Sequence, residues 1–141
     1  MKTPWHIWLI GALSLLWNAG GAFDYVMAHY APDTYLAAAT PEQRAYYDGF
    51  PAWATVFWAL GVWGALAGSV LLLARSRFAA VAFGISLIGL MVNTTRLFAT
   101  AGAEAVDLLG QGNLAFTALL IVVALGLWLY ARAMVRAGVL R

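Results

Sequence analysis

The sequence of 141 residues contains no cysteine. That absence excludes disulfides, thiolate metal sites, cysteine nucleophiles and iron–sulfur ligation together. Charged residues are scarce as well, at 10% of the chain, whereas soluble domains carry about 25%. A water-soluble fold with so few charges could not cover its surface, so we expect lipid to surround most of the protein.

Other absences narrow the function. The formal net charge is only +2, which argues against a nucleic-acid partner. The two histidines, His6 and His29, lie near opposite ends of one apolar segment and therefore cannot both ligate one haem. The sequence has no zinc-protease or phosphate-loop motif and no Ser–His–Asp pattern. We therefore predict a non-enzymatic protein with no catalytic residues, no metal site and no cofactor.

Long apolar runs are what the sequence does contain, with 64% hydrophobic residues. A helix needs about 20 predominantly apolar residues to cross a bilayer. Four segments meet this requirement, and the seven Trp and six Tyr suit the membrane interfaces. We predict a single all-α transmembrane domain spanning residues 1–141, a four-helix membrane bundle with helices at about 5–28, 51–74, 78–101 and 113–134.

The basic residues predict the orientation of these helices. Cytoplasmic loops of membrane proteins carry an excess of Lys and Arg. Alternate connections and both termini of this chain carry nearly all of them, and the other two connections are acidic. We therefore expect both termini in the cytoplasm. The basic residues on that side are Lys2, Arg75, Arg77, Arg132, Arg136 and Arg141.

The long outer connection, residues 29–50, contains two helix-start signals. One is Pro32-Asp33-Thr34. The other is Thr40-Pro41-Glu42-Gln43, in which Thr40 can cap, Pro41 suits the first helical position and Gln43 can complete a capping box. We expect two short surface helices, with interface anchors at Tyr35, Tyr46, Tyr47, Phe50 and Trp53.

The first and third apolar segments carry matching stripes of small and polar residues. Gly11, Ser14, Asn18, Gly21 and Tyr25 are spaced to share one helix face, and a shift of 75 residues places Ser86, Gly89, Asn93, Arg96 and Thr100 at equivalent positions. Small residues allow close packing, and amides can hydrogen-bond between helices. The two helices are expected to face each other or a shared polar interior that includes Ser14, Asn18, Tyr25 and Asn93. A parallel repeat of two hairpins and a chance alignment of Ala- and Leu-rich helices both remain open.

The second apolar segment has a glycine stripe at Gly61, Gly64 and Gly68. Gly64 and Gly68 are four residues apart, and a glycine pair at this spacing favours close contact between membrane helices. The pattern leaves open whether that contact lies within one chain or between chains.

Asp24 and Arg96 are the strongest functional candidates. An ionised side chain at the centre of a membrane helix costs about 2.5–3.5 kcal/mol on insertion scales. Both residues lie about one turn from the outer ends of their helices, so the sequence predicts an intramembrane charge pair. Such a pair can simply pin two helices together, or it can line an outward-facing polar pocket. Trp17, Trp58 and Trp63 lie too deep for interface anchors, and they can either pack or stack on sugar faces.

Three stretches resemble a known family: residues 17–27 (WNAGGAFDYVM), residues 49–53 (GFPAW) and residues 58–64 (WALGVWG). They are similar to a family of small four-helix bacterial inner-membrane proteins, some of which are labelled sugar transporters. The resemblance covers most of the chain. It implies the bacterial inner membrane and solute transport, and it carries over no binding residues.

Two classes of function are compatible with these features. The first is a small solute transporter or permease subunit, with a sugar-like solute, that forms a homo-oligomer because four helices enclose little interior. The second is a non-catalytic accessory or assembly subunit that packs against a larger membrane complex through its glycine face.

Overall fold

The computed structural model describes residues 2–105, 107 and 111–141, and these residues form helices with no strand among them. The long helices are α1 (Trp5–Tyr30), α4 (Ala52–Leu73), α5 (Phe78–Ala101) and α7 (Gln111–Arg136). Their bounds lie within two residues of the predicted ones. All four are long and apolar enough to cross a membrane. The all-helical prediction is confirmed, and the helices support a multi-pass membrane protein.

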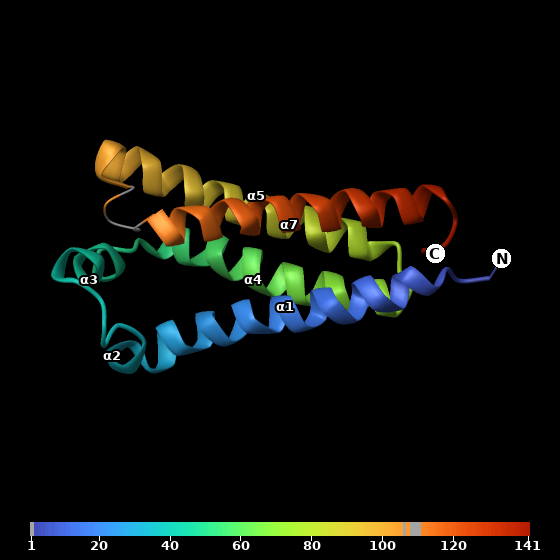
Figure 1. Cartoon of the computed structure of the whole chain (residues 1–141), viewed down its shortest axis with the longest axis horizontal. Coiled ribbons are helices and arrows are strands. Elements are labelled where there is room, and N and C mark those ends of the chain that lie inside the picture. The colour runs from blue at the N-terminus through green and yellow to red at the C-terminus, as the bar shows by residue number, and fades with distance from the viewer. Residues whose placement is uncertain (1, 106, 108–110) are drawn as a thin grey trace.

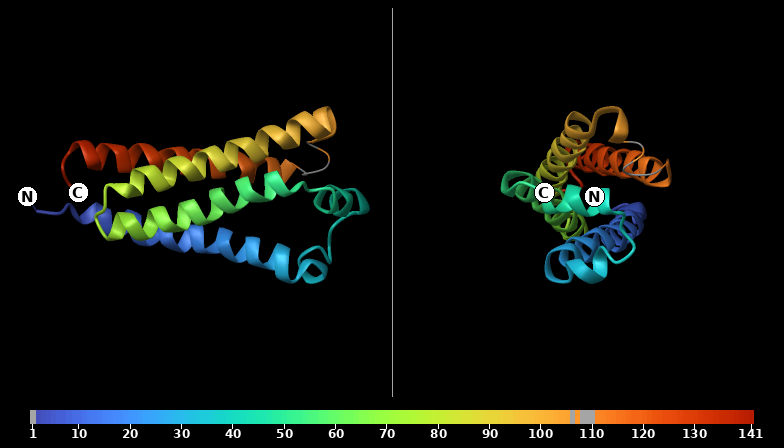
Figure 2. Two further views of the ribbon diagram at one scale, coloured as in Figure 1. Left: turned by 180° about the vertical axis from the view of Figure 1, so that it is seen from behind. Right: turned by 90° about the vertical axis from the view of Figure 1, so that its left-hand side faces the viewer.

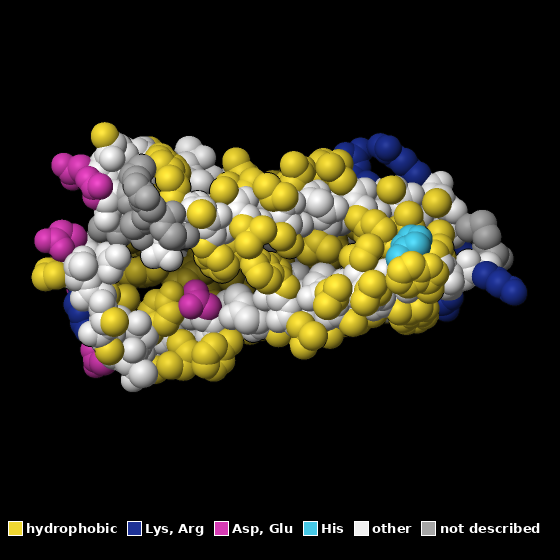
Figure 3. Space-filling view, viewed as in Figure 1, with side chains coloured by type: hydrophobic (Ala, Val, Ile, Leu, Met, Phe, Trp, Pro, Cys, Tyr) yellow, Lys and Arg dark blue, Asp and Glu magenta, His cyan; other side chains and the backbone are white. Residues whose placement is uncertain are grey.

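Charge is segregated between the two ends of the bundle, with an apolar band between them (Figure 3). The basic end holds both termini and the turn between α4 and α5 (Figure 1). The acidic end holds the connections between α1 and α4 and between α5 and α7. Its acidic residues are Asp33, Glu42, Asp48, Glu104 and Asp107.

The outer connection folds as predicted into two short helices, α2 (Pro32–Tyr35) and α3 (Pro41–Asp48). The predicted capping box is present at the start of α3. The Thr40 hydroxyl accepts from the Gln43 amide at 3.2 Å, and the Gln43 side chain accepts from the Thr40 amide at 3.1 Å. A short 3-10 turn, η1 (Gly102–Glu104), follows α5.

The long helices pack in the order α1, α4, α5, α7. Helices α1 and α7 converge at the basic end and separate toward the acidic end (Figures 1 and 2). At the basic end, Ile7, Leu72, Phe83 and Leu127 from the four helices form a buried apolar cluster. The chain end is held there too, since the Arg141 amide donates to the Arg75 carbonyl at 2.9 Å.

The predicted glycine contact is formed within the chain, between α4 and α5. A Cβ added at Gly64 would lie 3.1 Å from the Ala82 carbonyl oxygen, and one at Gly68 would lie 2.7 Å from the Phe83 ring. The tightest approach is at Gly89 of α5, where a Cβ would meet the Phe57 carbonyl oxygen and would lie 2.7 Å from the Gly61 nitrogen. The glycines thus allow the backbones of α4 and α5 to touch.

The matching stripes of α1 and α5 both pack on α4, so the two helices do not face each other. The other expected arrangement, a shared interior, agrees with a cavity lined by residues of both stripes, namely Asn18, Gly21, Ser86, Gly89 and Asn93. From α1, the Asn18 amide donates to the Ala65 carbonyl at 3.2 Å and to the Ser69 hydroxyl at 2.9 Å. From α5, the Asn93 amide donates to the Ala54 carbonyl at 3.2 Å. Helix α4 lies between α1 and α5 and supplies carbonyl groups to both. The proposed internal duplication stays a prediction.

We predict that Gly89→Ala destabilises the protein by about 1–3 kcal/mol, because the added methyl group would force α4 and α5 apart. Gly126→Ala is the matched control, since a Cβ at Gly126 meets nothing within 4 Å. The control should be neutral, or should stabilise by up to about 1 kcal/mol through its higher helix propensity. Reversible unfolding in mixed micelles measures both, and equal stabilities would contradict the backbone contact.

Candidate functional site

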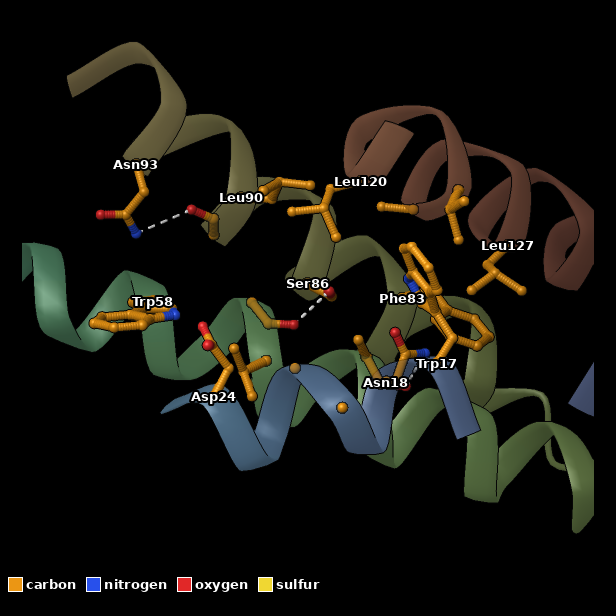
Figure 4. Close-up of a pocket in the computed structure, with 18 of the residues that line it drawn as sticks. Trp17, Asn18, Asp24, Trp58, Phe83, Ser86, Leu90, Asn93, Leu120 and Leu127 are labelled. Carbon is orange, nitrogen blue, oxygen red and sulfur yellow. Dashed lines mark hydrogen bonds between the residues drawn. The ribbon is translucent and has the colours of Figure 1, made fainter. Parts of the chain in front are cut away.

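A cavity of ≈ 530 Å³ lies within the bundle, lined by residues of all four long helices. The cavity exists because α1 packs on α4 and α7 packs on α5, while α1 and α7 diverge from each other toward the acidic end. The hollow is visible on the face shown in Figure 3, and Figure 4 shows side chains that line it. Most of the lining is apolar, and its polar side chains are Asn18, Asp24, Ser86 and Asn93.

Two adjacent glycines on α1 give the cavity its width. Gly20 and Gly21 both line it, and a Cβ added at either would have no neighbour within 4 Å. These glycines therefore serve a different purpose from those of α4 and α5. They leave space open, whereas the glycines between α4 and α5 let backbones touch.

Aromatic rings narrow the side of the cavity between α1 and α7. Trp17 of α1 and Phe116 of α7 approach with ring centroids 6.0 Å apart. Nearer the basic end, the His6 ring and the Tyr130 hydroxyl of these same helices share a hydrogen bond. The cavity opens sideways on the face shown in Figure 3.

The side-chain amide and hydroxyl donors of the lining are already hydrogen-bonded within the bundle. Asn18 and Asn93 donate to carbonyls of α4, and the Ser86 hydroxyl donates to the Gly61 carbonyl. The Oδ1 atom of Asn93, by contrast, is buried and has no partner among the described residues. A buried acceptor without a partner is uncommon in proteins, but this atom has almost no accessible surface and is therefore not exposed to the cavity.

Asp24 lines the cavity toward the acidic end, six residues before α1 ends. At 1.5 Å per residue, this places it about 9 Å below the helix end. In Figure 4 its carboxylate and the Trp58 ring of α4 both face into the cavity. The Tyr35 hydroxyl donates to the Asp24 carboxylate at 3.1 Å. One hydrogen bond leaves most of the accepting capacity of a carboxylate unused.

Arg96 has other partners, so the predicted ion pair with Asp24 is wrong. The Arg96 guanidinium donates to the Tyr46 hydroxyl at 2.9 Å. It also lies over two aromatic rings, 5.0 Å from the Tyr46 centroid and 4.5 Å from the Phe50 centroid. The folded outer connection brings tyrosines between the two helices, and these tyrosines provide each charge with its own partner.

The expected interface anchors of the outer connection mostly pack inward. Tyr47 contacts Tyr35, Tyr46 and Trp58 with ring centroids 6.0, 5.8 and 6.3 Å apart. Burial raises the pKa of Tyr46 and of Tyr47. The pKa of Tyr35 is raised as well, by burial first and then by Tyr47 and Asp24. These hydroxyls therefore remain protonated near neutral pH and can donate.

Two predicted interior residues do not line the cavity. Ser14 is buried and donates to the Gly11 carbonyl of its own helix at 3.0 Å. Tyr25 lies on another side of α1, with its ring 5.2 Å from Trp58, 6.1 Å from Trp63 and stacked at 4.2 Å on His29. Of the polar interior predicted from the stripes, Asn18 and Asn93 line the cavity.

Sequence reasoning missed the roles of Tyr35, Gly20 and Phe116. The adjacent glycines at 20 and 21 were the available signal, because two missing side chains within a membrane helix leave a gap. No local pattern pointed to Tyr35 or Phe116, since their partners are far away in the sequence. Within the described parts of the chain, no group of three or more His, Asp or Glu could hold a metal ion.

These features define a class, a multi-pass helical bundle with an open cavity that carries one acidic side chain. No protein-family model, curated protein or solved structure matches the chain. The family resemblance drawn from the sequence therefore stays a prediction.

We predict that Arg96 and Tyr46 are energetically coupled. Residues in contact within one network show interaction energies of about 0.5–3 kcal/mol in double-mutant cycles. The cycle Arg96→Ala with Tyr46→Phe should fall in that range, because each single change removes the same hydrogen bond. The cycle Asp24→Ala with Arg96→Ala is the comparison and should lie closer to additivity. A larger coupling for the second cycle would restore the direct charge pair.

Proposed function

We propose that this protein binds a small organic solute in the cavity between α1, α4, α5 and α7, and that it serves as a transporter or permease subunit. The cavity itself carries the proposal. Its ≈ 530 Å³ falls within the range of about 300–1,000 Å³ typical of small-molecule sites. Like those sites, it combines apolar and aromatic walls with a few polar groups.

The position of the polar groups supports a transport path. Asp24 lies near the acidic end, and Asn18 and Asn93 lie at the contacts with α4. Ionisable side chains within membrane helices commonly mark substrate or ion pathways. Trp17 and Trp58 add ring faces on which a sugar-like solute, the expectation from the family resemblance, could stack.

The lateral opening supports an oligomeric assembly. One chain leaves the cavity unclosed between α1 and α7, so a complete path across a bilayer needs further walls. We propose that a second copy of the chain supplies them, and that the surrounding lipid bilayer is the other partner.

An accessory or assembly subunit is the alternative function. The gap between α1 and α7 favours it, because a helix of a larger complex could fill that space. The glycine stripe does not support this alternative, because Gly64 and Gly68 contact α5 of the same chain. A non-enzymatic role is proposed in both cases.

We place the protein in the bacterial inner membrane with both termini in the cytoplasm. The basic residues at the end that holds the termini support this orientation, because cytoplasmic segments carry the excess of Lys and Arg. The resemblance supports the bacterial membrane.

A reporter fused after Arg141 tests the orientation. We predict that a fluorescent protein fused there folds and fluoresces, and that alkaline phosphatase at the same point is inactive. The matched control inserts the same reporters between Ala38 and Ala39 of the outer connection, where the pattern should reverse. Active phosphatase after Arg141 would place the basic end outside.

Filling the cavity tests the solute site. We predict that at least one member of a panel (glucose, xylose, phenyl glucoside, glycerol, tetraphenylphosphonium) changes the Trp emission of the protein saturably in lipid nanodiscs. Gly21→Leu should weaken that binding by about tenfold or more, equivalent to about 1.4 kcal/mol, because the new side chain occupies the empty space beside Gly21.

Gly126→Leu is the control for that test. Gly126 lies on α7, has open space around it and does not line the cavity, so its substitution should leave binding unchanged. A saturable signal that is unaffected by Gly21→Leu, or no signal from any member of the panel, would contradict the proposed site.

A further inference from the structure

The Asp24 carboxylate has no cationic partner in the described part of the chain. Two arginines lie toward the acidic end, and both are engaged elsewhere. Arg96 is held by Tyr46 and Phe50, and the Arg44 guanidinium donates to the Leu36 carbonyl at 2.7 Å. All other Lys and Arg residues lie at the opposite end of the bundle. A negative charge at membrane depth without a counter-charge is unfavourable, and residues of this kind mark ligand or ion sites.

The groups around Asp24 suit a cation. The Trp58 side chain lies at the same end of the cavity as Asp24 (Figure 4), and among aromatic side chains Trp attracts a positive charge over its ring face most strongly. Tyr35 donates one hydrogen bond to the carboxylate, and a donated hydrogen bond favours the charged form without neutralising it. The open space beside Gly20 and Gly21 leaves room for a ligand next to the carboxylate.

The rest of the cavity suits an apolar body. From Asp24 toward the basic end, the walls include Leu90, Leu120 and Phe83. Figure 4 shows these side chains of α5 and α7 around the space. The accessible acceptor of the lining is the Asp24 carboxylate, which accepts one hydrogen bond, whereas the amide and hydroxyl donors are already hydrogen-bonded within the bundle. An anion would meet a negative charge here. A sugar needs donors and acceptors for several hydroxyls.

We infer that the cavity takes an amphipathic organic cation, with the positive charge between Asp24 and Trp58 and the apolar body against the walls formed by α5 and α7. This inference rests on the solute site proposed above and names its substrate class.

The test compares two ions of the same shape and opposite charge. The full-length protein in lipid nanodiscs is titrated with tetraphenylphosphonium and with tetraphenylborate, and binding is measured by calorimetry against empty nanodiscs. We expect saturable binding of the cation only. Asp24→Asn should weaken cation binding by at least about tenfold, as expected when one partner of a partly desolvated charge pair is removed. Asp24→Glu should retain it.

Asp33→Asn is the matched control, since Asp33 is an exposed acidic residue of the short helix α2. It should leave both titrations unchanged. Asp24→Asn keeps an acceptor for Tyr35 and is expected to remain folded. If it does not fold, Trp58→Leu takes its place, with the same loss of cation binding expected from removal of the ring.

Equal binding of the two ions, or wild-type cation affinity in Asp24→Asn, would overturn the inference. If neither ion binds while a neutral member of the solute panel does, and Gly21→Leu weakens that binding, the cation class is wrong and the solute site stands. If no solute binds at all, the solute site and the inference both fail.

Discussion

The close contact between α4 and α5 is the constraint on which the bundle depends. In a bilayer, helices gain little from burying apolar surface, so they associate through close packing and hydrogen bonds between helices. Gly61, Gly64 and Gly89 let these two backbones touch, and Ser86 and Asn93 donate across the contact to α4 carbonyls. Helices α1 and α7 are then attached to this pair, one on each member. They meet at the basic end and diverge beyond it, and the cavity is the space that this divergence leaves.

Polar groups within the bundle fall into two kinds. The amides of Asn18 and Asn93 are used to hold α1 and α5 on α4, and their donors are satisfied by carbonyls. The Asp24 carboxylate, which accepts only one hydrogen bond, remains available at the cavity. Because the bilayer offers no water to compensate such groups, a carboxylate left without a counter-charge carries information about function that a fully paired group does not.

The outer connection controls the surroundings of this site. Its tyrosines form ring contacts that extend from Tyr35, beside Asp24, to Tyr46, beside Arg96. Tyr46 and Phe50 hold Arg96 through a hydrogen bond and two ring contacts, and Arg96 therefore does not pair with Asp24. The short helices α2 and α3 thus do more than join α1 to α4, since they determine which charge near the cavity is left without a counter-charge.

The sequence by itself determined the number, length and type of the helices, the capping box of α3 and the segregation of charge between the two ends. These features follow from composition and from residues close together in the chain. Asp24, Asn18 and Asn93 could be selected for the same reason, because a polar side chain in an apolar run is conspicuous. Only the tertiary structure decided their partners. Matched depth suggested that Asp24 pairs with Arg96, but tyrosines of the folded connection form hydrogen bonds with both charged side chains. Likewise, spacing identified the stripes of α1 and α5, and packing around α4 decided what they face. Which residues become partners depends on competition among residues far apart in the sequence. A local sequence pattern contains no information about that competition.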